Sequence, residues 1–308
     1  MDKVFLFSGQ GSQYVGMGKL LFDKFDFAKK IYNISNEILE YDIKEISFID
    51  DGKLLNQTKH TQPAIFIYSI ILDFFLKDNG YRPIAFSGHS LGEYSALVSA
   101  NIVSFDDALY IIKKRASKMQ NIGKEKPGKM AAIINNSVPE ILEAIKKYKN
   151  EIVVANYNTP LQTIVSGDKK CIEDLIANAK KNNIRKIIPL KVSGAFHSPL
   201  MKSARIYLEK FIKSTKFHDT KVPIYQNFCP KKNFNSKEIK DNIINQLDQP
   251  VRWVDTIQNM KKDGYKEYIE VGPKNILSNF NKKIIPNCHT SYVEDFKEFT
   301  IINEWFKK

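Results

Sequence analysis

The residues with the most distinctive chemical potential are residues 88–92, which form the pattern Gly-His-Ser-Leu-Gly. A short apolar stretch at 83–87 precedes this pattern, and a helix-like run at 93–98 follows it. Between a strand and a helix, the two glycines allow a turn sharp enough to raise the serine hydroxyl above the sheet edge. We therefore predict a nucleophile at Ser90, with a tight turn that has no chemistry as the alternative.

A serine hydroxyl becomes an effective nucleophile only when a base accepts its proton. The chain offers five histidines as candidates, namely His60, His89, His197, His218 and His289. His89 adjoins the serine and is expected to project away from it, whereas His60, His218 and His289 lie in polar sequence that suggests solvent exposure. His197 directly follows the point where the chain returns from an inserted unit, and we predict it as the base rather than as a structural histidine.

No acidic residue stands where a hydrolase triad would need one. In the usual order the acid lies in a loop between the serine and the histidine. The acidic residues of that interval fall in predicted helices or in the inserted unit, for example Asp106, Glu125, Asp168 and Glu173. We therefore expect a serine-histidine dyad whose imidazole is oriented by a backbone carbonyl.

A turn with two glycines, Gly9-Gln10-Gly11, follows the first predicted strand. The dinucleotide-binding pattern would need a third glycine at position 14, where the chain has Tyr14, so the match is weak. A side-chain amide at a strand end beside the serine could instead donate to a tetrahedral oxyanion, and we assign this role to Gln10. A plain turn is an equally good interpretation of the local sequence.

Arg115 lies just beyond an apolar helical stretch, residues 108–112. A guanidinium is always charged and can form two parallel hydrogen bonds to one carboxylate. In an acyl pocket, Arg115 would therefore select an acyl group that carries a free acid. The alternative is a solvated arginine, which is the common case on such helices.

These residues must be positioned by a core of alternating strands and helices. Strands are predicted at 3–7, 83–87, 222–226 and 267–271, and a buried helix covers the apolar run Ala64–Leu76, with Thr61 as its cap. Such alternation indicates an α/β fold with a parallel sheet.

Residues 129–191 follow a different pattern and are predicted to form a compact unit of their own. The expected order is strand 129–135, helix 139–148, strands 152–157 and 162–166, helix 169–182 and strand 186–190. This β-α-β-β-α-β order is the ferredoxin-like arrangement. We predict an inserted subdomain at 129–191 within a core formed by residues 1–128 and 192–308.

The composition excludes several classes of protein. Of the 308 residues, 43% are hydrophobic, and no window approaches the roughly 18 uninterrupted apolar residues of a membrane span. The first residues lack the basic and apolar pattern of an export signal, and the odd number of widely spaced cysteines forms no disulfide framework. We expect a cytoplasmic protein that does not insert into a membrane.

The formal net charge of +13 comes from lysines spread along the whole chain. Such a charge favours encounters with acidic partners, but it is also what a lysine-rich composition produces on solvated faces. The lysines form no arginine- or aromatic-interleaved strip of the kind that binds nucleic acid bases, so we predict no nucleic acid partner.

Taken together, these segments resemble the malonyl-CoA:acyl-carrier-protein transacylases of type II fatty-acid synthesis and the acyltransferase domains of polyketide synthases. The similar segments follow the family's order along nearly the whole chain, and they are Phe7–Gln13, Thr61–Ala64, Gly88–Leu97, Arg115 with Met119-Gln120, Ala155–Asn158, Ser193–Met201, Gln246–Trp253 and Glu270–Pro273.

The resemblance implies a hydrolase-like α/β core with an inserted ferredoxin-like subdomain. It also implies that Ser90 carries the acyl group, that His197 is the base, and that Gln10 and the Leu91 amide form the oxyanion hole. Arg115 would pair with the malonyl carboxylate, and Gln246 would offer its backbone carbonyl to His197. Further substrate contacts are expected from Gln62, Met119, Phe196 and Asn158.

The implied reaction is a ping-pong transfer of malonyl from malonyl-CoA to the phosphopantetheine thiol of an acidic acyl carrier protein, which supplies extender units for fatty-acid synthesis. No metal or bound organic cofactor is expected. Ser8 and Lys274 depart from the family's usual proline and glycine, and the segment Ala195–Ser198 resembles the signature of malonyl-selective members. Two other functions are considered, a serine esterase or thioesterase on the same core and a catalytically idle carrier-protein-binding module.

Overall fold

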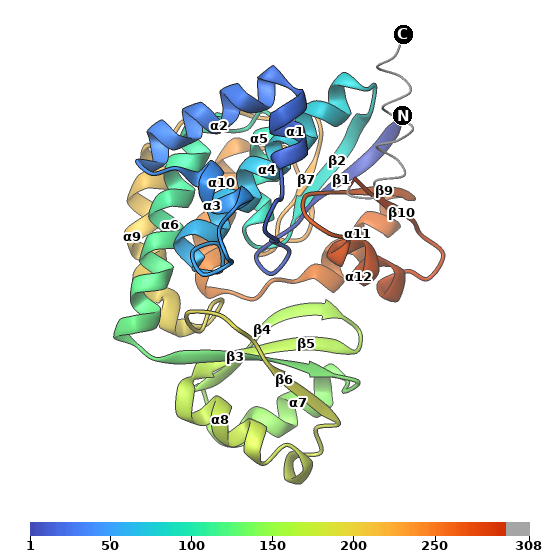
Figure 1. Ribbon diagram of the computed structural model, residues 1–308. Coiled ribbons are helices and arrows are strands. Elements are labelled where there is room, and N and C mark those ends of the chain that lie inside the picture. Colours follow the sequence, from blue (N-terminus) through green and yellow to red (C-terminus); the bar gives the residue numbers. More distant parts are fainter. Residues whose placement is uncertain (294–308) are drawn as a thin grey trace.

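The computed structural model describes residues 1–293, which form an α/β core and a smaller unit beneath it (Figure 1). The core sheet has the strand order β10-β9-β1-β2-β7-β8. The pairs β1–β2, β1–β9, β9–β10 and β2–β7 are parallel, and only β8 runs antiparallel to its neighbour. The predicted fold class is confirmed.

The core elements are β1 (Asp2–Phe7), α1 (Lys19–Lys24), α2 (Asp26–Leu39), α3 (Ile43–Phe48), α4 (Thr58–Asp78), β2 (Arg82–Gly88), α5 (Gly92–Ser99), α6 (Phe105–Glu125), α9 (Lys202–Ser214), β7 (Ile224–Tyr225), β8 (Lys232–Asn233), α10 (Ser236–Asn245), α11 (Trp253–Lys262), β9 (Glu267–Val271), α12 (Ile276–Ile284) and β10 (His289–Tyr292). Short 3-10 turns lie at Pro199–Met201 and Gln246–Asp248.

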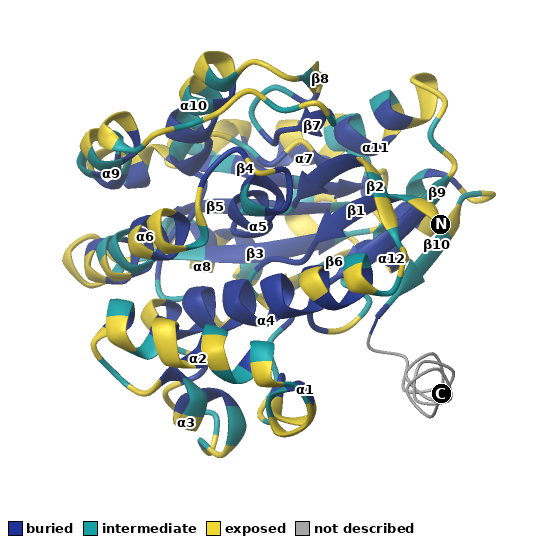
Figure 2. Cartoon of the chain, turned by 90° about the horizontal axis from the view of Figure 1, so that it is seen from above, coloured by how far each residue is buried: buried dark blue, intermediate teal, exposed yellow. Residues whose placement is uncertain are grey.

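The two faces of the core sheet are covered by different helices, as strand β1 illustrates. Successive side chains of a strand point to opposite faces. Phe5 and Phe7 join the large hydrophobic cluster that includes α4, α5 and α6, whereas Val4 and Leu6 join a second cluster with residues of α11 and α12. In Figure 2 the central strands and helices α4 and α5 are dark blue, while the outer faces of α2, α6 and α9 are exposed. The sheet is therefore buried on both faces.

Helix α4 is buried along most of its length, as its apolar sequence predicts. The prediction that Thr61 caps this helix is wrong, because the helix begins one turn earlier, at Thr58, and Gln57 occupies the cap position. The Thr61 hydroxyl instead donates to the carbonyl oxygens of Leu55 and Gln57, at 2.5 and 3.0 Å.

The smaller unit consists of β3 (Gly128–Ile134), α7 (Val138–Ile145), β4 (Ile152–Thr159), β5 (Gln162–Asp168), α8 (Lys169–Ala177) and β6 (Lys186–Pro189), with 3-10 turns at Lys146–Tyr148 and Lys180–Asn182. Its antiparallel sheet has the order β4-β5-β3-β6, with the ferredoxin-like connectivity expected from the sequence. In β3, Ala131 and Ile133 pack in the unit's own core, whereas Met130 and Ala132 face the large cluster of the α/β core.

Strand β4 connects the smaller unit to the core by backbone hydrogen bonds. Val251, just before α11, donates to Ala155 at 2.8 Å and accepts from the Tyr157 N–H at 2.9 Å. The His89 imidazole adds a side-chain bond of 2.9 Å to Asn158. These bonds fix one strand of the smaller sheet beside the loop that follows β2.

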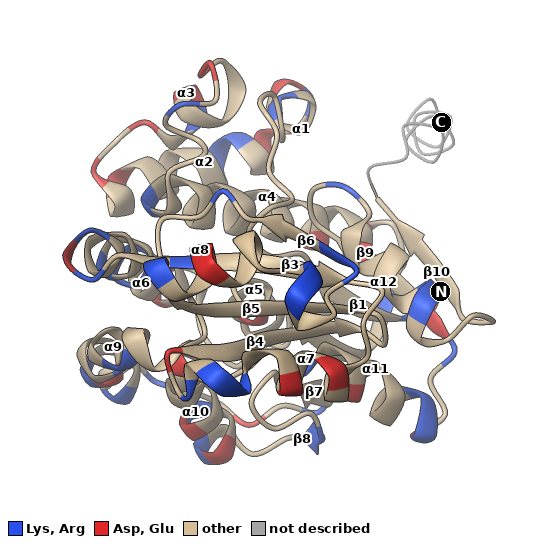
Figure 3. Cartoon of the chain, turned by 90° about the horizontal axis from the view of Figure 1, so that it is seen from below, with Lys and Arg blue, Asp and Glu red and all other residues tan. Residues whose placement is uncertain are grey.

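Charges of both signs are mixed on the lower face of the smaller unit (Figure 3). Lys129 pairs with Glu173 at 2.5 Å, and Lys147 lies 3.5 Å from Asp174. The excess of lysine is therefore not concentrated in one patch on this face. None of the helices in the described part of the chain is long and apolar enough to cross a membrane.

Helix α5 begins unusually close to the ends of β1 and β2. A Cβ atom on Gly92 would overlap the carbonyl oxygen of Phe7, and a Cβ atom on Gly88 would overlap the backbone of Gly92. Only glycine allows this approach of backbone to backbone, and the approach brings the turn at 89–91 to the edge of the sheet.

We predict that Gly92→Ala lowers the free energy of unfolding by about 1–3 kcal/mol, because the new methyl group must push α5 away from β1. The matched control is Ser95→Ala in the same helix, since the buried Ser95 hydroxyl has no hydrogen-bond partner among the described residues. Chemical denaturation of both variants measures the difference. Equal stability of Gly92→Ala and wild type would contradict the close approach.

Candidate active site

Ser90 occupies the turn between β2 and α5 with a backbone φ of 51°, in the left-handed region. This conformation is strained for a residue other than glycine and is typical of a nucleophile turn. The Asn227 side chain holds the turn, since it accepts the Ser90 N–H at 2.7 Å and donates to the Gly88 carbonyl at 2.6 Å. The serine hydroxyl is thereby held at the edge of the sheet, above the strand end.

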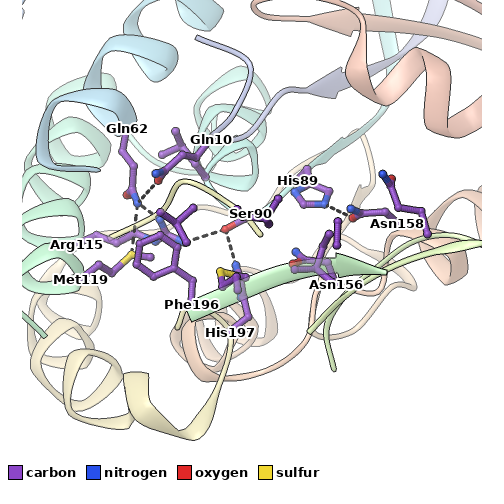
Figure 4. Close-up of a pocket in the computed structure, with 17 residues that line it drawn as sticks. Gln10, Gln62, His89, Ser90, Arg115, Met119, Asn156, Asn158, Phe196 and His197 are labelled. Carbon is purple, nitrogen blue, oxygen red and sulfur yellow. Dashed lines mark hydrogen bonds between the residues drawn. The ribbon is translucent and has the colours of Figure 1, made fainter. Parts of the chain in front are cut away.

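His197 is the partner of Ser90, as expected, and its Nε2 lies 2.7 Å from the serine Oγ (Figure 4). Its Nδ1 lies 3.1 Å from two backbone carbonyl oxygens, those of Gln246 and Gln249. A carbonyl oxygen can only accept, so the proton of the neutral ring sits on Nδ1 and the Nε2 lone pair faces the serine. This is the arrangement that a general base needs, and it contains no carboxylate.

Burial sets the protonation state of His197. The side chain is 4% exposed, and desolvation, followed by the positive charge of Arg115, lowers the pKa of His197 to about 3. The two carbonyl oxygens oppose this effect because they stabilise the charged ring. At neutral pH the imidazole is therefore uncharged and able to accept the serine proton.

Arg115 is 1% exposed and lies directly beside the nucleophile. Its Nη2 donates to Ser90 Oγ at 3.0 Å and to Gln246 Oε1 at 3.3 Å, while Nη1 donates to Gln62 Oε1 at 2.6 Å. The guanidinium carbon lies 5.6 Å from the centre of the Tyr94 ring. The solvated alternative for Arg115 is excluded, and α6 aims a buried cation at the reacting hydroxyl.

The guanidinium of Arg115 retains unused donor capacity. Its Nε is buried and has no hydrogen-bond partner among the described residues. A buried charged donor without an acceptor is costly, so an acceptor that reached this N–H would stabilise the guanidinium. The site is therefore suited to a small molecule that carries a negative charge.

The dyad and Arg115 line a cavity of about 250 Å³ between the core and the smaller unit. Most of the residues predicted for the site line the same cavity, namely Gln10, Gln62, Ser90, Leu91, Arg115, Met119, Asn158, Phe196 and His197. Gln246 lies behind it, in contact with both Arg115 and the dyad. The cavity is large enough for a short acyl group.

The Gln10 side chain lines the cavity and is held by two neighbouring side chains. Its amide nitrogen donates to the Thr58 hydroxyl at 3.2 Å, and its amide oxygen accepts from Gln62 at 3.4 Å. The backbone N–H groups of Gln10 and Leu91, in contrast, donate to no other group in residues 1–293. The candidate donors to an oxyanion at this site are therefore these two backbone amides and the second N–H of the Gln10 side chain.

The solvent exposure expected for His60 is wrong. Its ring is 6% exposed and packs edge-on against Tyr41 at 4.8 Å, and burial lowers the pKa of His60 to about 4. His218 and His289 are exposed, as predicted. His89 bonds Asn158 and packs near Trp253 rather than facing the Ser90 hydroxyl.

Several residues of the site could not be identified from the sequence. The Gln249 carbonyl shares the His197 proton with Gln246, and a backbone carbonyl leaves no signature in the residue type. Asn156 and Gln162 line the cavity from β4 and β5. Asn227 and the fully buried Glu93 lie behind the nucleophile; a charged residue inside an otherwise apolar helix is a signal that could have pointed to Glu93.

The chain is similar to proteins of known family and structure. The family model described as "Acyl transferase domain" matches residues 4–308. A relative from Bacillus subtilis, named malonyl CoA-acyl carrier protein transacylase, is 36% identical over 299 residues, which cover 96% of this chain and 94% of that protein.

Two solved structures extend this similarity to the fold. The malonyl CoA-acyl carrier protein transacylase of Clostridium perfringens has a TM-score of 0.91 at 33% identity, with 100% of this chain and 98% of that chain covered. A malonyl-transacylase solved in complex with a type II polyketide acyl carrier protein also has a TM-score of 0.91, at 29% identity, with 96% of each chain covered.

We predict that protonation of His197 destabilises the fold in acid. The folded-state pKa of about 3 lies below the ordinary value of 6.5, so the folded protein binds fewer protons than the unfolded chain between these values. The contribution of His197 to stability is present above pH 6.5 and is lost as the pH falls. Between pH 6.5 and 5, wild type should lose about 2 kcal/mol more unfolding free energy than His197→Asn.

Denaturant titrations of both proteins across this pH range measure the effect, with His218→Asn as the matched control at an exposed histidine. The control should follow wild type. Parallel curves for wild type and His197→Asn would mean that His197 titrates near its ordinary pKa.

Proposed function

The chain belongs to the malonyl-CoA:acyl-carrier-protein transacylases of the acyl transferase family, and we propose that it transfers malonyl from malonyl-CoA to an acyl carrier protein through an ester on Ser90. The observation that carries the proposal is the buried Arg115 guanidinium, 3.0 Å from the Ser90 hydroxyl and with an unused Nε donor. A nucleophile beside a desolvated cation is suited to an acyl group that ends in a carboxylate.

In the first half-reaction, the Ser90 oxygen attacks the thioester carbon of malonyl-CoA while His197 Nε2 takes the hydroxyl proton. The carbonyl oxygen becomes an oxyanion, which the backbone N–H groups of Gln10 and Leu91 are positioned to bind. When the carbon–sulfur bond breaks, His197 returns the proton to the sulfur. CoA leaves as a thiol, and malonyl remains as an ester on Ser90.

The second half-reaction reverses these roles. His197 takes the proton of the phosphopantetheine thiol of the carrier protein, and the sulfur attacks the malonyl ester. The ester bond breaks, and His197 gives the proton back to the Ser90 oxygen. The complex of a related malonyl-transacylase with its acyl carrier protein supports a carrier protein as this chain's acceptor.

The site argues against the two other functions considered. An esterase with a Ser-His-acid triad would place a carboxylate on His197 Nδ1, but in the described part of the chain Nδ1 faces only backbone carbonyl oxygens. An idle carrier-binding module would have no reason to keep Ser90 and His197 at 2.7 Å in a buried site. We further propose that the reaction takes place in the cytoplasm and feeds fatty-acid synthesis.

We predict that Ser90→Ala abolishes covalent loading of malonyl, because the variant lacks the attacking oxygen. Wild type mixed with malonyl-CoA should gain the mass of one malonyl group, and acyl carrier protein should remove it. Intact-protein mass spectrometry measures both steps. A malonyl adduct that persists on Ser90→Ala would place the nucleophile elsewhere.

We predict that Arg115→Ala reverses the preference for acid-bearing substrates. Removing one partner of a buried, hydrogen-bonded charge pair costs about 2–5 kcal/mol, and this loss should fall on kcat/KM for malonyl-CoA. Acetyl-CoA has no carboxylate to pair with the guanidinium, so its kcat/KM should be unchanged or higher. Lys118→Ala, one turn further along α6 with its ammonium group over the Tyr207 ring, is the matched control.

The malonyl to acetyl ratio, measured on each variant, separates selectivity from general damage. The control should keep the wild-type ratio. A parallel fall of both rates in Arg115→Ala would make Arg115 a structural residue.

A further inference from the structure

Glu93 is a fully buried carboxylate in the first turn of α5, three residues after the nucleophile. It accepts three hydrogen bonds: from Gln226 Nε2 at 2.9 Å, from the Asn227 backbone N–H at 2.8 Å and from Gln246 Nε2 at 3.1 Å. Glu93 itself does not line the cavity, and within residues 1–293 it forms no hydrogen bond with His197. Its function must therefore be exerted through its partners.

Two of these partners contact the reacting residues. The Asn227 side chain accepts the Ser90 N–H at 2.7 Å, and Gln246 Nε2 donates to the Ser90 carbonyl at 2.8 Å. The Gln246 backbone carbonyl faces His197 Nδ1, and its side-chain oxygen accepts from Arg115. The Glu93 carboxylate is thus hydrogen-bonded to Asn227 and Gln246. These two residues in turn contact Ser90, His197 and Arg115.

We propose that Glu93 is the positioning residue of this site, whose carboxylate fixes Asn227 and Gln246 so that the strained Ser90 turn and the His197 ring stay aligned for reaction. This inference rests on the proposed function only for the identity of the substrate. The hydrogen bonds around Glu93 are independent of that function. In a catalytic triad the acid orients the histidine by a direct hydrogen bond. Glu93 would orient His197 indirectly, through Gln246.

The hydrogen-bond pattern requires the ionised form of Glu93. All three partners present N–H groups to the carboxylate. In a protonated carboxyl, the new O–H donor would face one of these N–H donors without an acceptor. Gln226 cannot turn its amide to compensate, because its Nε2 also donates to the Ile239 carbonyl at 3.0 Å and its Oε1 accepts from Asn242 at 2.9 Å. Burial raises the pKa of Glu93 to about 7, against the effect of these hydrogen bonds and of Arg115.

Glu93→Gln tests this function, because it keeps the shape of the side chain and replaces one acceptor oxygen by a donor. The probe is phenylmethylsulfonyl fluoride, which needs only the dyad: Ser90 oxygen bonds to sulfur, fluoride leaves, and His197 takes the proton. We expect Ser90 sulfonylation and kcat for malonyl loading to fall about 10²-fold, as for a misplacement near 1 Å. KM for malonyl-CoA should change much less, because Arg115 keeps its bond to Gln62.

The matched control is Asp73→Asn, at a carboxylate that is 3% exposed and fixes the opposite end of α5 through Ser99 at 2.6 Å. Asp73 contacts no residue of the site, so this variant should lose thermal stability and keep the wild-type sulfonylation rate. A sulfonylation rate of Glu93→Gln within about twofold of wild type would overturn the proposal. So would an equal slowing of both variants.

Asn227→Ala provides a second test, because it keeps the backbone N–H that donates to Glu93 and removes the side-chain bonds to the Ser90 N–H and the Gly88 carbonyl, which hold the turn. It should slow sulfonylation as well, and a wild-type rate would overturn the proposal even if Glu93→Gln failed to fold. If wild type is sulfonylated at Ser90 but takes up no malonyl, the proposed function fails while these rates still test Glu93.

Discussion

The buried positive charge of Arg115 is the constraint on which the rest of the site depends. Taking a guanidinium out of water is costly unless polar groups surround it. Gln62 and Gln246 supply acceptor oxygens, the Tyr94 ring lies against the cation, and the Glu93 carboxylate provides a nearby negative charge. Several polar side chains around the nucleophile therefore stabilise the cation. Gln246 also contacts Ser90 and His197, so one of these groups links the cation to both reacting residues.

A second constraint is backbone strain at both reacting residues. Ser90 and His197 have φ values of 51° and 55°, which residues with side chains rarely adopt. Such conformations persist only where the surroundings determine them. At Ser90 this is achieved by the Asn227 side chain on the N–H and the Gln246 side chain on the carbonyl. At His197 the two carbonyl oxygens of residues 246 and 249 fix the ring, and Val251 connects that loop to β4.

The sequence was sufficient for features that depend on residue type at a fixed spacing. The G-x-S-x-G pattern located Ser90, the absence of an acid predicted a dyad, and the order of strands and helices predicted the ferredoxin-like unit. The sequence was insufficient where a backbone group contacts the site, because the Gln249 carbonyl beside His197 would be present with almost any side chain. Burial of His60 depends on packing against Tyr41, which is distant in sequence from the polar flank that suggested exposure.

Ser8 and Lys274, which depart from the family pattern, both form hydrogen bonds through their side chains. The Ser8 hydroxyl donates to the buried Glu270 at 2.9 Å, so a polar residue is satisfied at this position. Lys274 has a φ of 61°, a conformation that glycine adopts without strain, and its ammonium group donates to the Gln13 carbonyl at 3.2 Å. Both residues border the turn that carries Gln10 without changing a group that faces Ser90.

Because Arg115, Ser90 and His197 lie close together, the charge of the substrate affects the basicity of His197. Without substrate, the guanidinium 3.0 Å from Ser90 Oγ is one cause of the lowered pKa of His197. A carboxylate on Arg115 would offset that charge and raise the pKa of His197 toward its ordinary value. An acid-bearing acyl group would then strengthen the base that acts on Ser90, whereas acetyl would leave it weak. Because the malonyl carboxylate stays in place after CoA leaves, the same effect would serve the second transfer, when His197 takes the proton of the carrier thiol. Selectivity at this site therefore concerns the rate of the chemical step as well as binding.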